Sequence, residues 1–225
     1  MAVYTHLTED EIQRIADAYG IGKILHKKPI AEGVENSNYL IGTDTTKYIL
    51  TIYEKRVKTE DIPFFLGIME HLAEHEIPCP LPLHTVEGKS TVEVGEKTGA
   101  IVTFLEGKSA VSIRNEHMRP LGAISAKMHL RVASFKQFRE NDLSFSGWQN
   151  LAGKIGARAD EIQPGLKAII DDELAYLKDH WPKENALPRG VVHADLFPDN
   201  VFYLDGALSG VIDFYFACTD FFIYD

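Results

Sequence analysis

Hydrophobic residues near the start of the chain recur at the spacing of one helix face. Thr8 precedes them and Glu11 follows it by three positions, a pairing in which each side chain can satisfy a backbone amide of the first turn. Gly20 comes directly after the last apolar residue and predicts the end of the helix, because glycine readily adopts the left-handed conformation found there. The residues of the apolar face are Ile12, Ile15, Ala16 and Tyr19.

The next segment has the short apolar runs of β-strands. Between residues 30 and 53, the runs NYLIG and KYILTIY flank the polar residues TDTT and predict a hairpin. Residues 61–76 return to helical spacing. Three prolines in IPCPLPLHTVEGK then exclude a helix, because proline fixes φ and has no amide proton. Two more strands are expected at about residues 91–94 and 100–104.

After Gly107 the pattern becomes mostly helical, and two late strands meet at the turn-forming pair Asp205-Gly206. Strands gathered in one part of the chain and helices in another favour an α+β fold in two lobes. We expect a β-rich N-terminal lobe over residues 1–106 and a mainly helical C-terminal lobe over residues 107–225, with a cleft between them. The expected helices of the second lobe are residues 114–131, 147–161 and 165–180, and its strands are about 201–204 and 208–214.

Composition and charge exclude several classes of protein. Hydrophobic residues make up 45% of the 225 positions and charged residues 25%, which is typical of a globular chain. The formal net charge of -10 argues against a nucleic-acid-binding surface. No apolar run approaches the ~20 residues of a membrane span, and no signal peptide is evident at the N-terminus.

Cysteine and histidine residues give no sign of a disulfide framework or a zinc site. Cys79 and Cys218 lie far apart and fit no metal-ligand motif, so a cytoplasmic location is expected. Five histidines show no ligand spacing with carboxylates or cysteines. They are His71, His75, His84, His117 and His129.

The stretch HADLFPDN, from His193 to Asn200, carries the candidate chemistry. It matches H-x-D-L-x-x-x-N, the pattern of a kinase catalytic loop. Phosphoryl transfer requires mainly positioning and the neutralisation of charge. Asp195 is therefore the candidate for accepting or orienting the proton of an attacking hydroxyl, and His193 is expected to brace the loop through hydrogen bonds.

Asp213 stands thirteen residues after Asn200, at the end of a predicted strand. Magnesium prefers oxygen ligands and takes one or two of them from protein. Asn200 and Asp213 are therefore the candidate metal ligands, brought together by the hairpin between them. The alternative is an ordinary surface turn, since Asp, Asn and Pro are frequent in turns. The spacing of Asp213 and its strand context favour the kinase interpretation.

Further segments extend the similarity along the whole chain. They are AEGVENSNYLI, YILTIYEKR, FFLGIMEHLAEHEIPCPLP, AIVTFLEG, HADLFPDNVFYL and GVIDFYFAC, of which GVENSNY and DFYFAC are the most discriminating. Together they resemble the aminoglycoside-phosphotransferase-like kinases, small-molecule kinases with a protein-kinase-like fold. The resemblance is strongest to members that phosphorylate the side-chain hydroxyl of L-homoserine, a step that leads to threonine. It implies ATP and Mg²⁺ as cofactors.

The resemblance also implies a phosphate-covering loop at EGVENSN. Gly33 would allow close approach of the backbone, and Asn36, Ser37 and Asn38 would donate to phosphate oxygens. From the residues alone, one glycine is weak evidence, and a plain β-turn is an equal alternative.

TFLEG lies where the family links its lobes, so Thr103, Phe104 and Leu105 are implied as neighbours of the adenine, with Phe104 and Leu105 as its contacts. A buried strand end is the alternative for this segment, and the two interpretations are compatible.

The sequence departs from the kinase pattern where a strand Lys usually pairs with a Glu of the following helix. Thr51 occupies the expected Lys position, and Phe65 and Gly67 occupy the helix positions facing it. The cation that contacts the phosphates is thus unassigned. The candidates are Lys55, Arg56 and Lys58.

The end of the chain is a second departure. CTDFFIYD places Asp220 and Asp225 at the expected entry to a helix, in the region of the family's acidic tail motif. Kinases of the family continue with several helices that help to wall the acceptor site. The resemblance therefore implies a C-terminal lobe that is truncated at Asp225.

The motif predicts an ATP-dependent, magnesium-requiring small-molecule kinase, and the resemblance implies L-homoserine as its acceptor. One alternative is a related kinase that phosphorylates choline or an aminoglycoside. The other is a nucleotide-binding module without turnover, motivated by the absent Lys–Glu pair and by the chain end. The oligomeric state and the acceptor-binding residues are not indicated.

Overall fold

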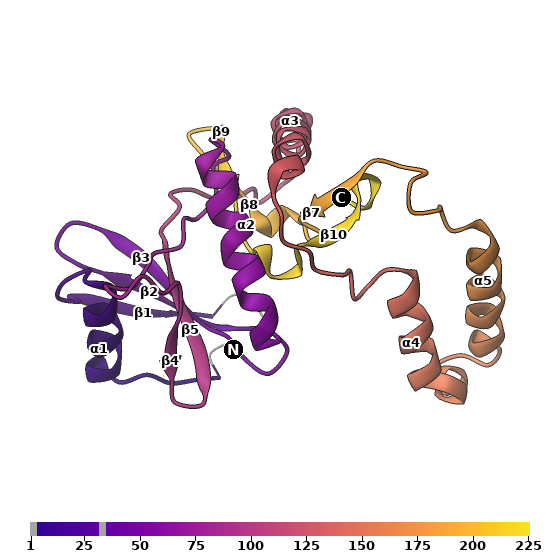
Figure 1. The fold of residues 1–225 in the computed structure, drawn as a ribbon, viewed down its shortest axis with the longest axis horizontal. Coiled ribbons are helices and arrows are strands. Elements are labelled where there is room, and N and C mark those ends of the chain that lie inside the picture. Colours follow the sequence, from indigo (N-terminus) through magenta and orange to yellow (C-terminus); the bar gives the residue numbers. More distant parts are fainter. Residues whose placement is uncertain (1–3, 32–34) are drawn as a thin grey trace. The chain divides into compact units, whose positions relative to one another are not determined.

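The computed structural model describes residues 4–31 and 35–225, which form two compact units (Figure 1). The first unit contains the described residues up to Gln137 together with Asp195–Phe216. The second contains Phe138–Ala194 and Ala217–Asp225. These units are defined by packing within the chain and not by lobes. The lobe boundary expected between residues 106 and 107 therefore stays a prediction.

A five-stranded antiparallel sheet forms most of the first unit, and its strand order is β1-β2-β3-β5-β4. The hairpin expected around TDTT is confirmed, because β2 pairs with β3 on either side of that turn. In this register Asn38 lies opposite Thr51 on the neighbouring strand. The strands are β1 (His26–Ile30), β2 (Ser37–Gly42), β3 (Lys47–Ile52), β4 (Val92–Val94) and β5 (Lys97–Thr103).

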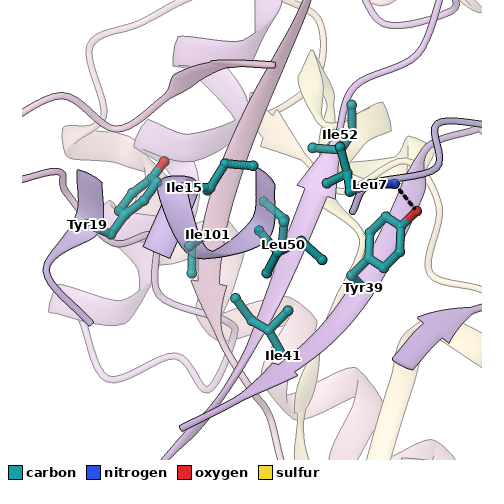
Figure 2. Close-up of a cluster of buried hydrophobic side chains, with 9 residues drawn as sticks. Leu7, Ile15, Tyr19, Tyr39, Ile41, Leu50, Ile52 and Ile101 are labelled. Atoms are coloured by element: carbon teal, nitrogen blue, oxygen red, sulfur yellow. Dashed lines mark hydrogen bonds between the residues drawn. The ribbon is translucent and has the colours of Figure 1, made fainter. Parts of the chain in front are cut away.

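Helix α1 (Glu9–Tyr19) covers one face of this sheet and forms its hydrophobic core (Figure 2). The capping box of Thr8 and Glu11 is present, and Gly20 ends the helix with a left-handed φ of 65°, as the sequence predicted. The backbone N–H of Leu7 donates to the Tyr39 hydroxyl at 3.2 Å, which anchors the segment before the helix. The core residues are Leu7, Ile12, Ile15, Tyr19, Tyr39, Ile41, Leu50, Ile52 and Ile101.

Helix α2 (Ile62–Glu74) begins with a proline in its first turn, where the missing amide proton costs no hydrogen bond. Its buried face includes Phe65, whose ring meets the Tyr215 ring edge to face with centroids 5.9 Å apart. Tyr215 belongs to a 3-10 turn, Phe214–Phe216, that follows the last strand of this unit. The helix thus supports the segment that carries Asp213.

A second, three-stranded sheet of the first unit has the order β6-β8-β9. Its hairpin turns at Asp205 and Gly206, which both have positive φ (50° and 82°), as the Asp-Gly signal predicted. The remaining elements of the unit are β6 (Lys108–Ser109), α3 (Asn115–Arg131), β8 (Val201–Leu204) and β9 (Ala207–Val211).

The second unit combines two helices with a two-stranded antiparallel sheet of β7 and β10. Trp148 and Trp181 pack edge to face, with ring centroids 5.4 Å apart. The elements are α4 (Phe145–Ile155), α5 (Leu166–His180), β7 (Arg189–Val192) and β10 (Cys218–Phe221).

Three sequence predictions of element bounds were wrong. The helix expected at 147–161 ends at Ile155, because Gly156 takes a positive φ of 54° and starts a 3-10 segment. The strand expected to reach residue 214 ends at Val211. Asp220 lies in β10 and not at a helix entry, because its strand pairs with β7 and the Asn141 amide binds its carboxylate at 2.6 Å.

Candidate active site

A short loop brings Asp195 and Asn200 together. Asn200 is buried, and its Nδ2 donates to Oδ2 (2.8 Å) and to the backbone oxygen (2.9 Å) of Asp195. The backbone N–H of Phe197 also donates to the Asp195 carbonyl, at 2.8 Å. The bond to Oδ2 orients the Asp195 side chain, and the two bonds to the backbone oxygen hold the loop. Since the amide nitrogen of Asn200 points to Asp195, Oδ1 is the atom of this amide that can ligate a metal.

Asp213 lies two residues after β9, in a left-handed backbone conformation with a φ of 65°. Aspartate tolerates this conformation better than most residues. The backbone N–H of Ile212 donates to the Asn200 carbonyl at 2.9 Å, so the turn that ends β9 brings Asp213 beside Asn200. The two predicted metal ligands therefore lie on neighbouring backbone segments, although a turn and not the strand itself positions Asp213. Their joint binding of a metal stays a prediction.

The charges of Asp195 and Asp213 interact. The pKa of Asp213 is raised to about 6, mainly by loss of hydration and also by the charge of Asp195, while the backbone N–H of Tyr215 opposes the rise. Loss of hydration also raises the pKa of Asp195, against the lowering effect of the Asn200 amide. The Asp213 side chain nevertheless reaches solvent. Neighbouring carboxylates with raised pKa values form a charge pattern that a divalent cation relieves.

His193 and Asp225 belong to the second unit. His193 is buried, with 1% of its surface exposed. Its backbone N–H donates to Asp225 Oδ2 at 3.0 Å, and that of Ala194 donates to Oδ1 at 2.7 Å. Ala194 has a positive φ of 63°, so the Asp225 carboxylate holds a strained piece of backbone. The bracing role expected for the His193 side chain stays a prediction.

The residues Asn36–Asn38, predicted to bind phosphate, lie at the start of β2. Asn36 Oδ1 accepts from the Glu54 backbone N–H at 3.2 Å, and Asn38 Oδ1 accepts from Thr51 Oγ1 at 2.8 Å. Both amides use their oxygen atoms within the protein, which makes their Nδ2 groups the candidate phosphate donors. Gly33, the predicted glycine of this loop, lies outside the described residues.

Ser37 has an internal role that the sequence did not indicate. It is fully buried, and its Oγ donates to Glu54 Oε1 at 2.7 Å while accepting from the backbone amides of Tyr4 (2.8 Å) and Thr5 (2.9 Å). Lys97 forms an ion pair with the same buried glutamate. These contacts tie the start of the chain to the predicted phosphate loop, and a direct contact of Ser37 with phosphate stays a prediction.

The other predicted nucleotide residues follow β5. Thr103 forms two hydrogen bonds with Leu81. The Thr103 N–H donates to the Leu81 carbonyl at 2.9 Å, and the Leu81 N–H donates to Thr103 Oγ1 at 2.8 Å. Phe104 and Leu105 are partly buried, and Lys47 Nζ lies 5.3 Å from the centre of the Phe104 ring. The strand end is therefore firmly held, and the contact of this segment with adenine stays a prediction.

Arg56, one of the three candidate cations, lies next to the predicted phosphate loop. Its guanidinium pairs with Glu35, the residue before Asn36, at 3.4 Å.

Within residues 4–31 and 35–225, no three side chains of His, Cys, Asp or Glu gather as a metal site. The same part of the chain contains no helix long and apolar enough to cross a bilayer.

Residues 26–225 match the model of the phosphotransferase enzyme family. The chain belongs to this family. The homoserine kinase of Sinorhizobium medicae (strain WSM419) is 52% identical over 225 residues, which are all of this chain and 68% of that protein. The homoserine kinase of Paramagnetospirillum magneticum (strain ATCC 700264 / AMB-1) is 51% identical over an alignment that covers all of this chain and 70% of that protein. The chain thus spans about two thirds of the length of these relatives.

Solved structures of phosphotransferases have the same fold. An amicoumacin kinase in complex with AMP-PNP and Ca²⁺ has a TM-score of 0.74 at 19% identity, over 96% of this chain and 66% of that chain. A spectinomycin phosphotransferase in complex with ADP and spectinomycin has a TM-score of 0.73 at 14% identity, over 98% and 72%. The α+β, protein-kinase-like fold expected from the sequence is therefore confirmed.

Proposed function

We propose that this phosphotransferase catalyses the ATP-dependent phosphorylation of the side-chain hydroxyl of L-homoserine, giving O-phospho-L-homoserine. The choice of acceptor is supported by relatives named homoserine kinase, which match along the whole chain at 52% and 51% identity. We place the reaction in the cytoplasm, which suits the two free thiols, Cys79 and Cys218.

The observation that carries the proposal is the bond of 2.8 Å between Asn200 Nδ2 and Asp195 Oδ2. It holds one carboxylate oxygen in place, and Oδ1 is then the atom that receives or orients the proton of the acceptor hydroxyl. Loss of hydration raises the pKa of Asp195, which strengthens this carboxylate as a proton acceptor. His193, two residues earlier, has a supporting role through its buried ring.

We assign Mg²⁺ to Asn200 and Asp213. The amide oxygen and the carboxylate are hard ligands, and two protein ligands are typical for a magnesium ion that also binds phosphates. The raised pKa of Asp213, which the charge of Asp195 increases, supports a cation here, because a cation would offset the repulsion between the two carboxylates. When bound, ATP with Mg²⁺ supplies the phosphoryl group and the positive charge that phosphoryl transfer requires.

We assign the nucleotide to the loop that contains Gly33 and to the segment Thr103–Leu105. The Nδ2 groups of Asn36 and Asn38 are its proposed phosphate donors, since their oxygen atoms are used within the protein. Ser37 acts indirectly in this proposal, by fixing the loop through Glu54.

The test is ADP release by the purified protein with a panel of acceptors. Homoserine is a zwitterion, so a site built for it should reject hydroxybutyrate and aminopropanol, which lack the ammonium and the carboxylate, by a factor of roughly 10⁴. Serine, one methylene shorter, should lose rate mainly because its hydroxyl is misplaced. A preference for choline or an aminoglycoside would replace the proposed acceptor. Nucleotide binding without ADP release for any acceptor would reduce the protein to a nucleotide-binding module.

A further inference from the structure

Two segments that are far apart in the sequence are linked through Thr51. This residue is buried in β3, with 2% of its surface exposed, and its Oγ1 donates to Asn38 Oδ1 at 2.8 Å. The Tyr215 hydroxyl donates to the same Oγ1 over a longer distance of 3.5 Å. Thr51 therefore lies between the predicted phosphate loop and the residues that follow Asp213.

Tyr215 is well placed to transmit this contact. Its ring packs edge to face against Tyr53 and Phe65, with centroids 5.3 and 5.9 Å away and interplanar angles of 85° in both cases. Its backbone N–H donates to the Asp213 carboxylate. One residue thus touches the proposed metal ligand with its backbone and Thr51 with its side chain.

The chain of contacts runs through uncharged groups at a position where kinases usually place a charged pair. Thr51 occupies the Lys position, and Phe65 lies on the helix that would carry the Glu. A buried lysine without its partner would cost far more than a hydroxyl that donates to Asn38.

We propose that Tyr215, acting through Thr51 and Asn38, is a positioning residue that fixes Asp213 relative to the phosphate-binding segment in place of the Lys–Glu pair. The inference rests on the proposed nucleotide site but not on the identity of the acceptor. It assigns a role to both discriminating segments, because Asn38 belongs to GVENSNY and Tyr215 to DFYFAC.

The test measures Mg²⁺-dependent binding of a non-hydrolysable ATP analogue by isothermal titration calorimetry. Tyr215→Phe and Thr51→Val each remove a hydroxyl and keep the packing shape, and each should weaken binding roughly three- to tenfold. The double variant should bind no more weakly than Thr51→Val alone, because both changes break one chain of contacts. Thr51→Ser keeps the hydroxyl and should restore most of the affinity.

Tyr19→Phe is the matched control, since it removes a buried hydroxyl that donates to the Ser90 carbonyl at 3.0 Å, outside the proposed site. It should lower the melting temperature about as much as Tyr215→Phe and leave nucleotide affinity unchanged. The proposal is overturned if Tyr215→Phe binds like the unmodified protein, if the two effects add, or if Tyr19→Phe weakens binding equally.

A measurement of homoserine phosphorylation distinguishes a failure of this proposal from a failure of the proposed function. Nucleotide binding that depends on Tyr215 and Thr51, without phosphorylation of homoserine, would overturn the acceptor and support the positioning role. An unmodified protein that binds no Mg²⁺–nucleotide would overturn both.

Discussion

Asp225 holds the backbone of His193 at the start of the catalytic motif, with its Oδ2 accepting the His193 N–H at 3.0 Å. Oδ1 of the same carboxylate accepts the next amide, from Ala194, whose positive φ of 63° is costly for alanine. A single carboxylate therefore stabilises a backbone shape that the residue type does not favour.

We expect Asp225→Asn to lower kcat by about tenfold, because the amide can accept only one of the two bonds and carries no charge. Steady-state kinetics with saturating ATP and homoserine would measure the loss. Asp179→Asn, which removes an exposed carboxylate on α5, should have no effect on kcat. Equal rates for the two variants would show that the backbone of His193 and Ala194 keeps its shape without Asp225.

Asp195→Asn should lower kcat by about 10²–10⁴-fold, because the side chain keeps its size but can no longer accept the proton. Affinity for the nucleotide should be maintained, which calorimetry can check. The control is Asp199→Asn, a loss of charge at an exposed position of the same loop. A variant that retains most of its activity would remove Asp195 from the proposed role.

Asp213 should make stability depend on pH in the metal-free protein. Its pKa is raised from 3.8 to about 6, so folding favours the neutral form, and its charge destabilises the native state above about pH 6 but not below about pH 4. Asp213→Asn should therefore raise the melting temperature at about pH 8 and leave it unchanged at about pH 4. Thermal melts at the two pH values test the sign, and a fall at high pH would contradict it.

Gly210→Ala should destabilise the protein by about 1–3 kcal/mol, because overpacking forces the backbone to move. A Cβ at this position would lie 2.5 Å from the Pro78 carbonyl oxygen, which also accepts the Val211 N–H at 3.0 Å. Gly122→Ala in α3 is the control, since nothing lies within 4 Å of its Cβ. That variant should be neutral or stabilising, and chemical denaturation would compare the two.

The elements with strong local signals could be predicted from the sequence. The capping box of Thr8 and Glu11 and the Asp205-Gly206 turn are determined by residues close to each other in the chain, so local patterns suffice. The motif of eight residues likewise places Asp195 and Asn200 on one short loop, although their hydrogen bond was not predicted.

The parts that the sequence did not reveal depend on contacts between distant residues. Asp220 looks like the start of a helix until β10 pairs with β7. The bond from the Ser37 hydroxyl to Glu54 and the contact of Tyr215 with Thr51 each join residues that are distant in the chain. Local sequence patterns do not predict such contacts, because each contact joins two residues that are far apart in the chain.

The family match begins at residue 26, but the bonds of Ser37 and Glu54 reach back to Tyr4 and Thr5. A fragment that begins at residue 26 would also lack α1, and the apolar face of β2, β3 and β5 would then be exposed to water. Such a fragment should aggregate during expression, and an affinity tag fused close to Tyr4 should disturb nucleotide affinity more than one placed on an exposed loop. The stretch matched by the family model therefore leaves out residues that pack against its own sheet.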